Sequence, residues 1–155
     1  MNIEKININI NNDILNLRRI GEKRISISNN DIFAYPNRKY NYNVNLSGIE
    51  NNFYINNGNP VTGLFEEITF CSDTFFDCTL FKNVTFKKCN FNNISIRWCT
   101  FQKCKFISCK GYIGYIRATT FKKDCMFDNT NIDIEFVDEY MYFNAKRYGY
   151  PKEIK

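Results

Sequence analysis

The side chains of this sequence that could do chemistry are thiols and carboxylates. Seven cysteines are present and no histidine, which removes the commonest general base, the Ser–His and Cys–His pairs and the usual nitrogen ligand of zinc. Adjacent carboxylates such as Glu66 and Glu67 point in different directions on a strand or a helix, so they do not form an acid pair. No glycine-rich phosphate loop is present. We therefore expect a protein that is not an enzyme, has no small-molecule substrate and needs no cofactor.

Neither the number of cysteines nor the N-terminal sequence is typical of a secreted, disulfide-bonded protein. Their number is odd, and the N-terminus MNIEKININI lacks a basic segment followed by an apolar one. No apolar stretch is long enough to span a membrane. We expect reduced thiols in a cytoplasmic protein that does not bind membranes, most of them acting as small buried hydrophobic groups.

Basic residues dominate the stretch from Cys78 to Lys123. It contains ten Lys and Arg and no Asp or Glu, in a chain whose net charge is +5. The one tryptophan of the chain, Trp98, follows Arg97 directly within it. Acidic residues return from Asp124 onward. Because catalytic groups are scarce and charge is segregated, we expect the function to reside on the surface of the protein.

A period of five residues decides how these side chains are positioned. From Phe86 to Phe121, every fifth residue is Phe or Ile with one exception, Gly111. Small or slender residues lie two positions before these central residues: Val84, Cys89, Ile94, Cys99, Cys104, Cys109, Gly114 and Thr119. A period of five fits neither a helix nor a flat strand. It requires a backbone that turns a corner every five residues.

The repeats resemble those of the pentapeptide-repeat family, which have a central Leu or Phe and a small residue two positions before it. The segments CNFNN (89–93), CTFQK (99–103) and CKFIS (104–108) match that pattern directly, and VTFKK (84–88) and TTFKK (119–123) match it closely. The resemblance implies a right-handed, four-sided β-helix over residues 63–134, with about 20 residues in each coil. The motif is specific for the fold and not for an activity.

The repeat is interrupted at three places. After Phe70 the register slips by one residue, so the next two central residues are either Phe75 and Leu80 or Phe76 and Phe81. Near Asp124 an extra residue moves the central positions to 127 and 132, and such insertions are typical of bulges. At Gly111 we expect an irregular coil, in which residue 112 or 113 fills the space of the missing side chain.

The two flanks are predicted to cover the ends of the β-helix. Residues 1–62 alternate apolar and polar residues, as strands do, and we expect a β-rich capping segment or degenerate early coils. In residues 135–155, acidic residues come first, basic residues follow, and Gly149 and Pro151 come last, which predicts an α-helix. We expect an all-β protein with a C-terminal α-helical cap, either a monomer or a homodimer formed through that helix.

Folding the sequence into coils of 20 residues stacks Cys89 and Cys109 within disulfide distance, which leaves a bridge between them as an alternative to free thiols. Ligands five residues apart would point inward in columns without converging, so we expect no metal site. The same folding groups the basic residues. We predict a partner-binding surface made of Arg97, Trp98, Lys103, Tyr115, Arg117, Lys122 and Lys123.

An exposed tryptophan beside arginine is typical of a binding hot spot, although lysines also simply keep a β surface soluble. Well-known members of the family imitate DNA with an acidic surface and so inhibit gyrase or topoisomerase IV. The surface predicted here has the opposite charge. We favour a bacterial module that binds an acidic protein surface, such as an immunity protein that inhibits a toxin domain. DNA mimicry, nucleic-acid binding and effector targeting remain as alternatives.

Overall fold

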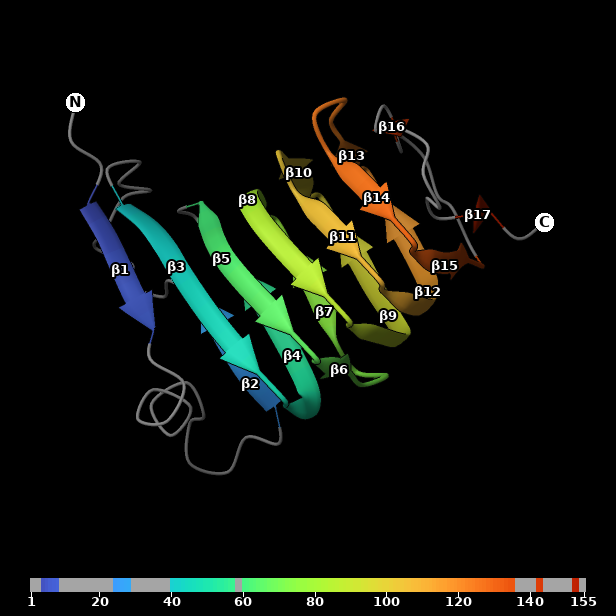
Figure 1. The fold of residues 1–155 in the computed structure, drawn as a ribbon, viewed down its shortest axis with the longest axis horizontal. Coiled ribbons are helices and arrows are strands. Elements are labelled where there is room, and N and C mark those ends of the chain that lie inside the picture. The colour runs from blue at the N-terminus through green and yellow to red at the C-terminus, as the bar shows by residue number, and fades with distance from the viewer. Residues whose placement is uncertain are drawn as a thin grey trace.

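The computed structural model describes residues 4–8, 24–28, 40–57, 60–135, 142–143 and 152–153. Their regular structure consists of β-strands that form two parallel sheets (Figure 1). The first sheet contains β1 (Glu4–Ile8), β3 (Tyr40–Ser47), β5 (Val61–Glu66), β8 (Leu80–Lys87), β10 (Thr100–Gln102), β11 (Lys105–Ile107), β13 (Thr120–Phe121), β14 (Met126–Asp128) and β16 (Tyr142–Phe143). The second contains β2 (Arg24–Ser28), β4 (Glu50–Asn56), β6 (Thr69–Phe70), β7 (Phe75–Asp77), β9 (Asn90–Arg97), β12 (Lys110–Arg117), β15 (Asn131–Ile134) and β17 (Lys152–Glu153).

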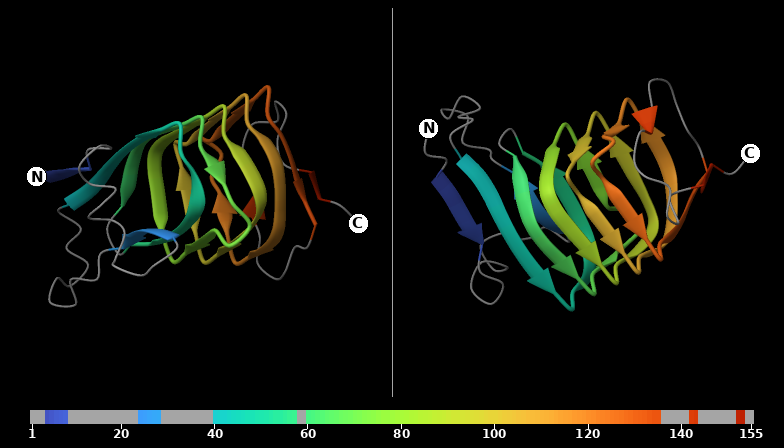
Figure 2. Two further views of the ribbon diagram at one scale, coloured as in Figure 1. Left: turned by 90° about the horizontal axis from the view of Figure 1, so that it is seen from below. Right: turned by 45° about the horizontal axis from the view of Figure 1, so that its top comes forward.

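The two sheets are the walls of a parallel β-solenoid of about five turns (Figure 2). Phe65, Phe86, Phe106 and Phe127 lie in register on β5, β8, β11 and β14, so successive coils contain 20 or 21 residues. Between Phe86 and Phe106, the chain has three further central positions, 91, 96 and 101. Each of these coils therefore has four sides with one inward central residue per side. The period of five in the sequence thus corresponds to one side of a coil.

The corners of the coil have a left-handed backbone conformation. Ten residues other than glycine have φ between 47° and 59°, and each follows a central residue by two positions: Glu67, Cys78, Asn83, Lys88, Asn93, Trp98, Lys103, Ser108, Ala118 and Asn129. This conformation costs an L-residue roughly 1–2 kcal/mol. Hydrogen bonds between coils hold it, as when the amide of Lys88 donates to the carbonyl of Ile107 at 2.8 Å.

The interior is filled by columns of aromatic rings. Phe81, Phe101 and Phe121 stack almost in parallel, with centroid separations of 4.8 and 4.6 Å. Phe106 and Phe127 stack in the neighbouring column at 4.4 Å. All five side chains are buried. The prediction that the Phe and Ile residues at every fifth position from 86 to 121 form the core is confirmed.

The structure resolves the register that the sequence left open. Phe76 and Phe81 are buried, whereas Phe75 and Leu80 face outward and are partly exposed. The extra residue is accommodated in a turn closed by a hydrogen bond from the amide of Thr74 to the carbonyl of Cys71 at 2.9 Å. The expected insertion near residue 124 forms the same kind of turn, since the amide of residue 125 donates to the carbonyl of residue 122 at 3.0 Å.

The coil is irregular at Gly111, as expected. Gly111 has φ of 129°, and a Cβ placed there would lie 2.0 Å from the carbonyl oxygen of Phe91 in the coil below. The pairing of β12 with β9 shifts register on both sides of Ile113. Ile113 turns inward and is buried, while Tyr112 stays half-exposed. The close approach of two backbones and the side chain of Ile113 together replace the missing central side chain.

The solenoid extends into residues 40–57. β3 pairs in parallel with β5, and β4 pairs with β6 and β7, so both continue the same two sheets. Val44, Leu46, Phe53 and Ile55 are buried in the same core. The N-terminal segment was expected to be either a β-rich cap or a set of degenerate early coils, and residues 40–57 form such coils. Most of residues 1–39 lie outside the described residues.

The predicted C-terminal α-helix is wrong. No helix occurs in the described residues, and those beyond residue 135 are the two short strands β16 and β17. Tyr142 and Phe143 pair with β13, and residues 152–153 pair with β15, so the chain continues the parallel ladder. The edge of the last coil has backbone N–H and C=O groups that need partners. Strand pairing with this edge can outweigh the local preference of the sequence for a helix. The remaining residues of this segment lie outside the described part.

Candidate functional site

The candidate site is the outer surface of one side of the solenoid, which we call the Trp98 surface. It consists of Arg24, Tyr54, Phe75, Asp77, Arg97, Trp98, Tyr115 and Arg117. Apart from Trp98, which lies at the corner after β9, these residues come from β2, β4, β7, β9 and β12, whose strands pair in parallel register. One column holds Tyr54, Phe75, Ser95 and Tyr115, and the next holds Asp77, Arg97 and Arg117.

Trp98 occupies a corner of this surface. Its exposed fraction is 55%, and it is the one large hydrophobic side chain classed as exposed in the described residues. Its φ is 56°, and its amide donates to the carbonyl of Arg117 in the next coil at 3.0 Å. The corresponding corners of the adjacent coils are Cys78 and Ala118. A bulky aromatic residue is an unusual occupant of the left-handed region, where Asn, Asp and Gly are favoured.

Arg97 is fixed by a carboxylate from the coil below. Its Nε and Nη2 donate to Oδ1 and Oδ2 of Asp77, each at 3.2 Å. The side chain of Asp77 is 8% exposed and that of Arg97 is 43% exposed. The hydrogen bonds and charge of Asp77 raise the pKa of Arg97 above its ordinary value. The guanidinium also lies 5.3 Å from the ring centroid of Phe75. Arg97 is therefore a pre-oriented cation rather than a mobile one.

A second arginine–aromatic contact extends the surface toward the N-terminal coils. The guanidinium of Arg24 lies 4.4 Å from the ring centroid of Tyr54. The rings of Tyr54 and Phe75 are 6.1 Å apart and inclined by 58°. Planar cations over aromatic faces are arrangements that proteins use in recognition.

The structure brings together four of the seven residues predicted from the sequence. Arg97, Trp98, Tyr115 and Arg117 lie on β9, β12 and the corner that follows β9. Tyr115 and Arg117 are half-buried and both make contacts with neighbouring groups.

The three lysines lie on the next side of the coil. Lys103, Lys122 and Lys123 are exposed, beyond the corner that carries Trp98. The amide of Lys103 donates to Oδ1 of Asp124 at 2.9 Å, which ties this corner to the turn in the next coil. The predicted surface is thus two adjoining sides, one with arginines and aromatic rings and one with lysines.

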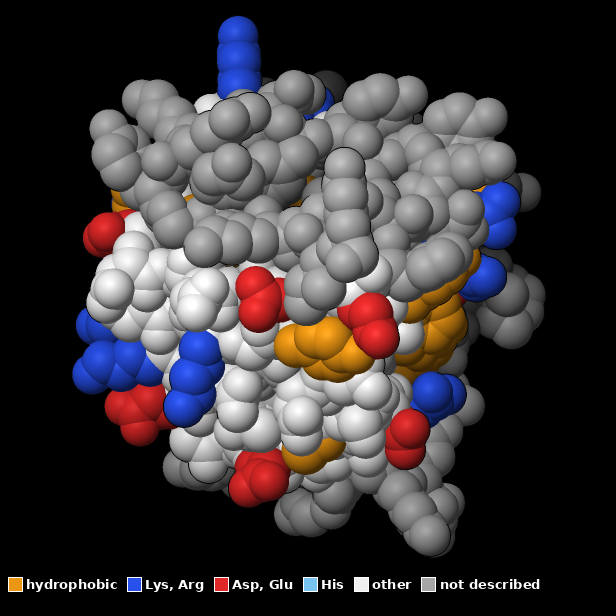
Figure 3. Space-filling model, turned by 90° about the vertical axis from the view of Figure 1, so that its right-hand side faces the viewer, with side chains coloured by type: hydrophobic (Ala, Val, Ile, Leu, Met, Phe, Trp, Pro, Cys, Tyr) orange, Lys and Arg blue, Asp and Glu red, His pale blue; other side chains and the backbone are white. Residues whose placement is uncertain are grey.

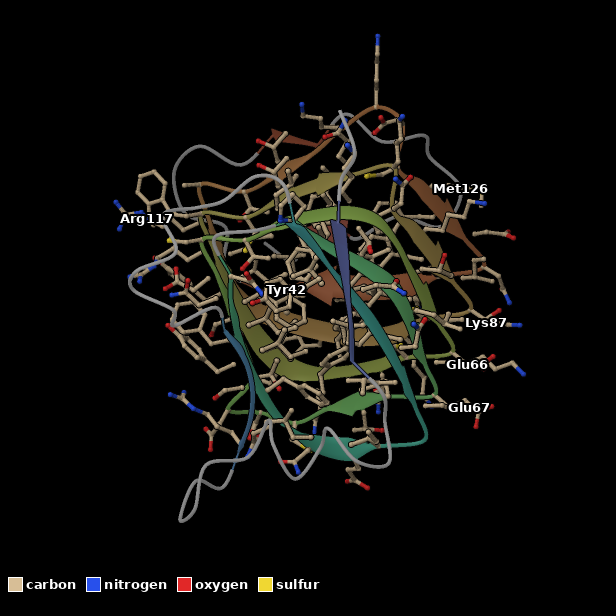
Figure 4. All side chains as sticks on the ribbon, turned by 90° about the vertical axis from the view of Figure 1, so that its left-hand side faces the viewer. Tyr42, Glu66, Glu67, Lys87, Arg117 and Met126 are labelled. Carbon is tan, nitrogen blue, oxygen red and sulfur yellow. The ribbon has the colours of Figure 1, made fainter. Side chains whose placement is uncertain are left out.

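Charges elsewhere are mixed. Figure 4, a view along the solenoid from its N-terminal end, shows Arg117 on one side and Glu66, Glu67 and Lys87 on the opposite side. There, Lys87 and Glu66 form an ion pair at 3.6 Å. Acidic and basic side chains are interspersed on the end that carries the last coil (Figure 3). Within the described residues, the arginine–aromatic contacts lie on the Trp98 surface.

Sequence reasoning missed Asp77, Phe75, Tyr54 and Arg24. Tyr54 precedes its register partner Phe75 by 21 positions, and Asp77 precedes Arg97 by 20. A known coil length would therefore have predicted these neighbours. The one-residue insertion before Thr74 prevented this prediction, because the inward positions between residues 70 and 86 could not be assigned from the sequence. Asp77 also lies one residue before the stretch that contained only basic charges.

The described residues contain no cluster of three or more His, Cys, Asp or Glu side chains that could hold a metal ion. None of their elements is a helix able to cross a bilayer. All seven cysteines are free thiols, of which five are buried, Cys71 is partly exposed and Cys78 is exposed. Comparison with protein-family models found no matching family, and searches of curated proteins and of solved structures found no match either.

Proposed function

We propose that this chain is a pentapeptide-repeat protein that acts without catalysis, by binding a partner protein and covering a surface that the partner needs. The family proposal is supported by the repeats of five residues together with a parallel solenoid of about five turns. The proposed partner has an acidic surface, and the proposed role is that of an inhibitor or immunity protein that neutralises a toxin.

The observation that carries this proposal is the position of Trp98. The corner conformation favours a small or amide side chain, and Asn occupies it at positions 83, 93 and 129. A tryptophan there adds strain and exposes apolar area, neither of which helps folding. Such a residue is expected where binding rather than stability determines the side chain.

The neighbours of Trp98 suit the same role. Arg97 is held by Asp77 and therefore loses little conformational entropy when a partner's carboxylate approaches it. The rings of Tyr54, Phe75 and Tyr115 provide contact area in one column. The lysines on the adjoining side attract an acidic partner before contact.

The test replaces Trp98 with the residue that the fold prefers at corners. Trp98→Asn should keep or raise the free energy of unfolding, by up to about 1 kcal/mol, because Asn tolerates a positive φ. It should weaken partner binding by about 30-fold or more, as expected for the loss of a hot-spot tryptophan. Lys88→Asn is the matched control, since Lys88 is a corner residue with φ of 52° on another side of the coil.

Wild type, Trp98→Asn and Lys88→Asn should be used to capture proteins from the native host, and the captured protein should then be titrated against each. The proposal expects tight binding by wild type and Lys88→Asn alone, and loss of the captured protein's toxicity on co-expression with wild type. A lower melting temperature for Trp98→Asn would show that Trp98 serves the fold. A topoisomerase bound equally by all three proteins would support DNA mimicry instead.

A further inference from the structure

Two pairs of buried cysteines lie directly above one another in adjacent coils. The amide of Lys110 donates to the carbonyl of Cys89 at 3.0 Å, which places Cys109 above Cys89. The amide of residue 126 donates to the carbonyl of Cys104 at 2.9 Å, which places Cys125 above Cys104. Neighbouring parallel strands are ~4.8 Å apart. That separation lies within the range of roughly 4.4–6.8 Å that disulfides span between Cα atoms.

The thiols of each pair have the same orientation. The Sγ atoms of Cys89 and Cys109 donate to the carbonyl oxygens of Phe65 and Phe86, each at 3.1 Å. Those of Cys104 and Cys125 donate to carbonyl oxygens of the coil below at 3.2 and 3.0 Å. Because every thiol makes the same contact one coil further along, the sulfur atoms follow one another in two columns.

The two members of a pair also differ in acidity. The neighbouring thiol of Cys89 lowers the pKa of Cys109, and the neighbouring thiol of Cys104 lowers the pKa of Cys125. The thiolate is the attacking species in thiol–disulfide exchange. Ionisation of one thiol of each pair therefore starts the exchange.

We propose that these two pairs are oxidation sites, at which the protein forms inter-coil disulfides Cys89–Cys109 and Cys104–Cys125 on exposure to a small-molecule disulfide such as oxidised glutathione. The thiolate of Cys109 attacks one sulfur of that disulfide and releases a glutathione thiolate. The thiolate of Cys89 then attacks the Cys109 sulfur and releases the second one. Two protein thiols lose two electrons and two protons, and one small-molecule disulfide becomes two thiols. Cys125 and Cys104 react in the same way.

Because the thiols are buried, local opening of a coil controls the rate. Each bridge closes a loop of 20 or 21 residues and joins two consecutive coils. Oxidation should therefore raise the melting temperature by about 10 °C. This inference does not depend on the proposed partner.

The chain contains its own controls. Cys99 lies in a column between Thr79 and Thr119, as the hydrogen bonds between their coils show. Cys78 shares its corner column with Trp98, and the amide of Cys71, which follows the paired residues Asn51 and Phe70, donates to the carbonyl of Asn51 in the coil below. These three cysteines have no cysteine above or below them. Oxidation should therefore divide the seven thiols into four that pair and three that do not.

The experiment incubates the reduced full-length protein with excess oxidised glutathione in a low concentration of urea, which permits coil opening. Peptide mapping without reduction and thiol titration follow. We expect two linked peptide pairs, 89 with 109 and 104 with 125, with Cys99 still free. The melting temperature should rise and return to its original value after reduction with dithiothreitol.

Cys109→Thr tests the assignment, because Thr130 occupies the next position of that column and its hydroxyl donates to the equivalent carbonyl oxygens, those of Phe106 and Asp128. This variant should lose one linked pair and about half of the rise in melting temperature. If it fails to fold, the wild-type map still decides the question. Glutathione adducts confined to Cys71 and Cys78, with the four stacked thiols still reduced, would overturn the proposal. So would an oxidised protein that melts at a lower temperature.

Discussion

At the scale of single residues, burial divides the cysteines into two classes of reactivity. Cys99 is buried, and loss of hydration raises its pKa to about 12. Cys78 is exposed, and its pKa is raised by partial burial and by a hydrogen bond to Asp77. A raised pKa leaves both thiols mainly protonated at neutral pH, so exposure decides which of them a reagent reaches, and the buried Cys99 is the protected one.

We predict that iodoacetamide at pH 8 modifies Cys78 and Cys71 first and leaves Cys99 and Cys104 unmodified until the protein unfolds. Mass spectrometry of peptides after timed labelling measures this order. Labelling in denaturant is the control, because there all seven thiols should react at similar rates. Early native labelling of Cys99 would contradict the inward position of its side chain.

Gly111 is a second residue whose environment gives a definite expectation. Replacement by Ala would place a Cβ 2.0 Å from the carbonyl oxygen of Phe91, at a φ of 129°. We predict a loss of more than about 2 kcal/mol in the free energy of unfolding, measured by urea denaturation. Gly48→Ala is the matched control, since Gly48 also has a positive φ but nothing lies within 4 Å of the added atom. Equal losses for both variants would show that contact with Phe91 is unimportant.

At the scale of elements, the stacked rings hold consecutive coils together. The ring of Phe101 lies between those of Phe81 and Phe121, with centroids 4.8 and 4.6 Å away. Phe101→Ala should lower the free energy of unfolding by about 3–5 kcal/mol, as for other buried aromatic side chains. Gln102→Ala, the next residue outward on β10, should cost less than about 0.5 kcal/mol. A loss below about 1 kcal/mol for Phe101→Ala would be incompatible with this core.

The sequence predicted the elements where one residue type marks every coil. Phe and Ile at each fifth position identified the inward columns from residue 86 to 121. Residues 40–57 were harder to assign, because Val44, Leu46, Phe53 and Ile55 do not follow the period of five. The C-terminal segment was wrongly predicted, since capping signals describe local preference and not the edge of a sheet nearby. The pairing of Asp77 with Arg97 could not be predicted either, because it depends on the length of the coil that contains the insertion.

At the scale of the whole molecule, arginine–aromatic contacts and lysines occupy adjoining sides of the solenoid. We predict that Lys122→Glu/Lys123→Glu mainly slows association with the partner and reduces the dependence of the association rate on salt. Dissociation should change little, because these exposed side chains lie outside the Trp98 surface. Stopped-flow or surface-plasmon-resonance measurements at several salt concentrations give both rates.

Lys88→Glu/Lys105→Glu is the control for this prediction. It changes the net charge by the same amount, at two exposed residues that both lie on the side formed by β11 and the end of β8. If both double variants slowed association equally, net charge rather than the lysine side would control the encounter. If neither did, attraction of an acidic partner would not operate through these lysines.

The exposure of the single tryptophan has a spectroscopic consequence. Trp98 is the only indole in the chain and is more than half exposed, while the core consists largely of phenylalanine and aliphatic side chains. Its fluorescence should therefore have the emission maximum of a hydrated indole and should be quenched readily by acrylamide in the folded protein. Unfolding should change this signal little, whereas burial against a partner should move it to shorter wavelength and protect it from the quencher. The protein thus carries an intrinsic optical reporter that distinguishes binding from folding.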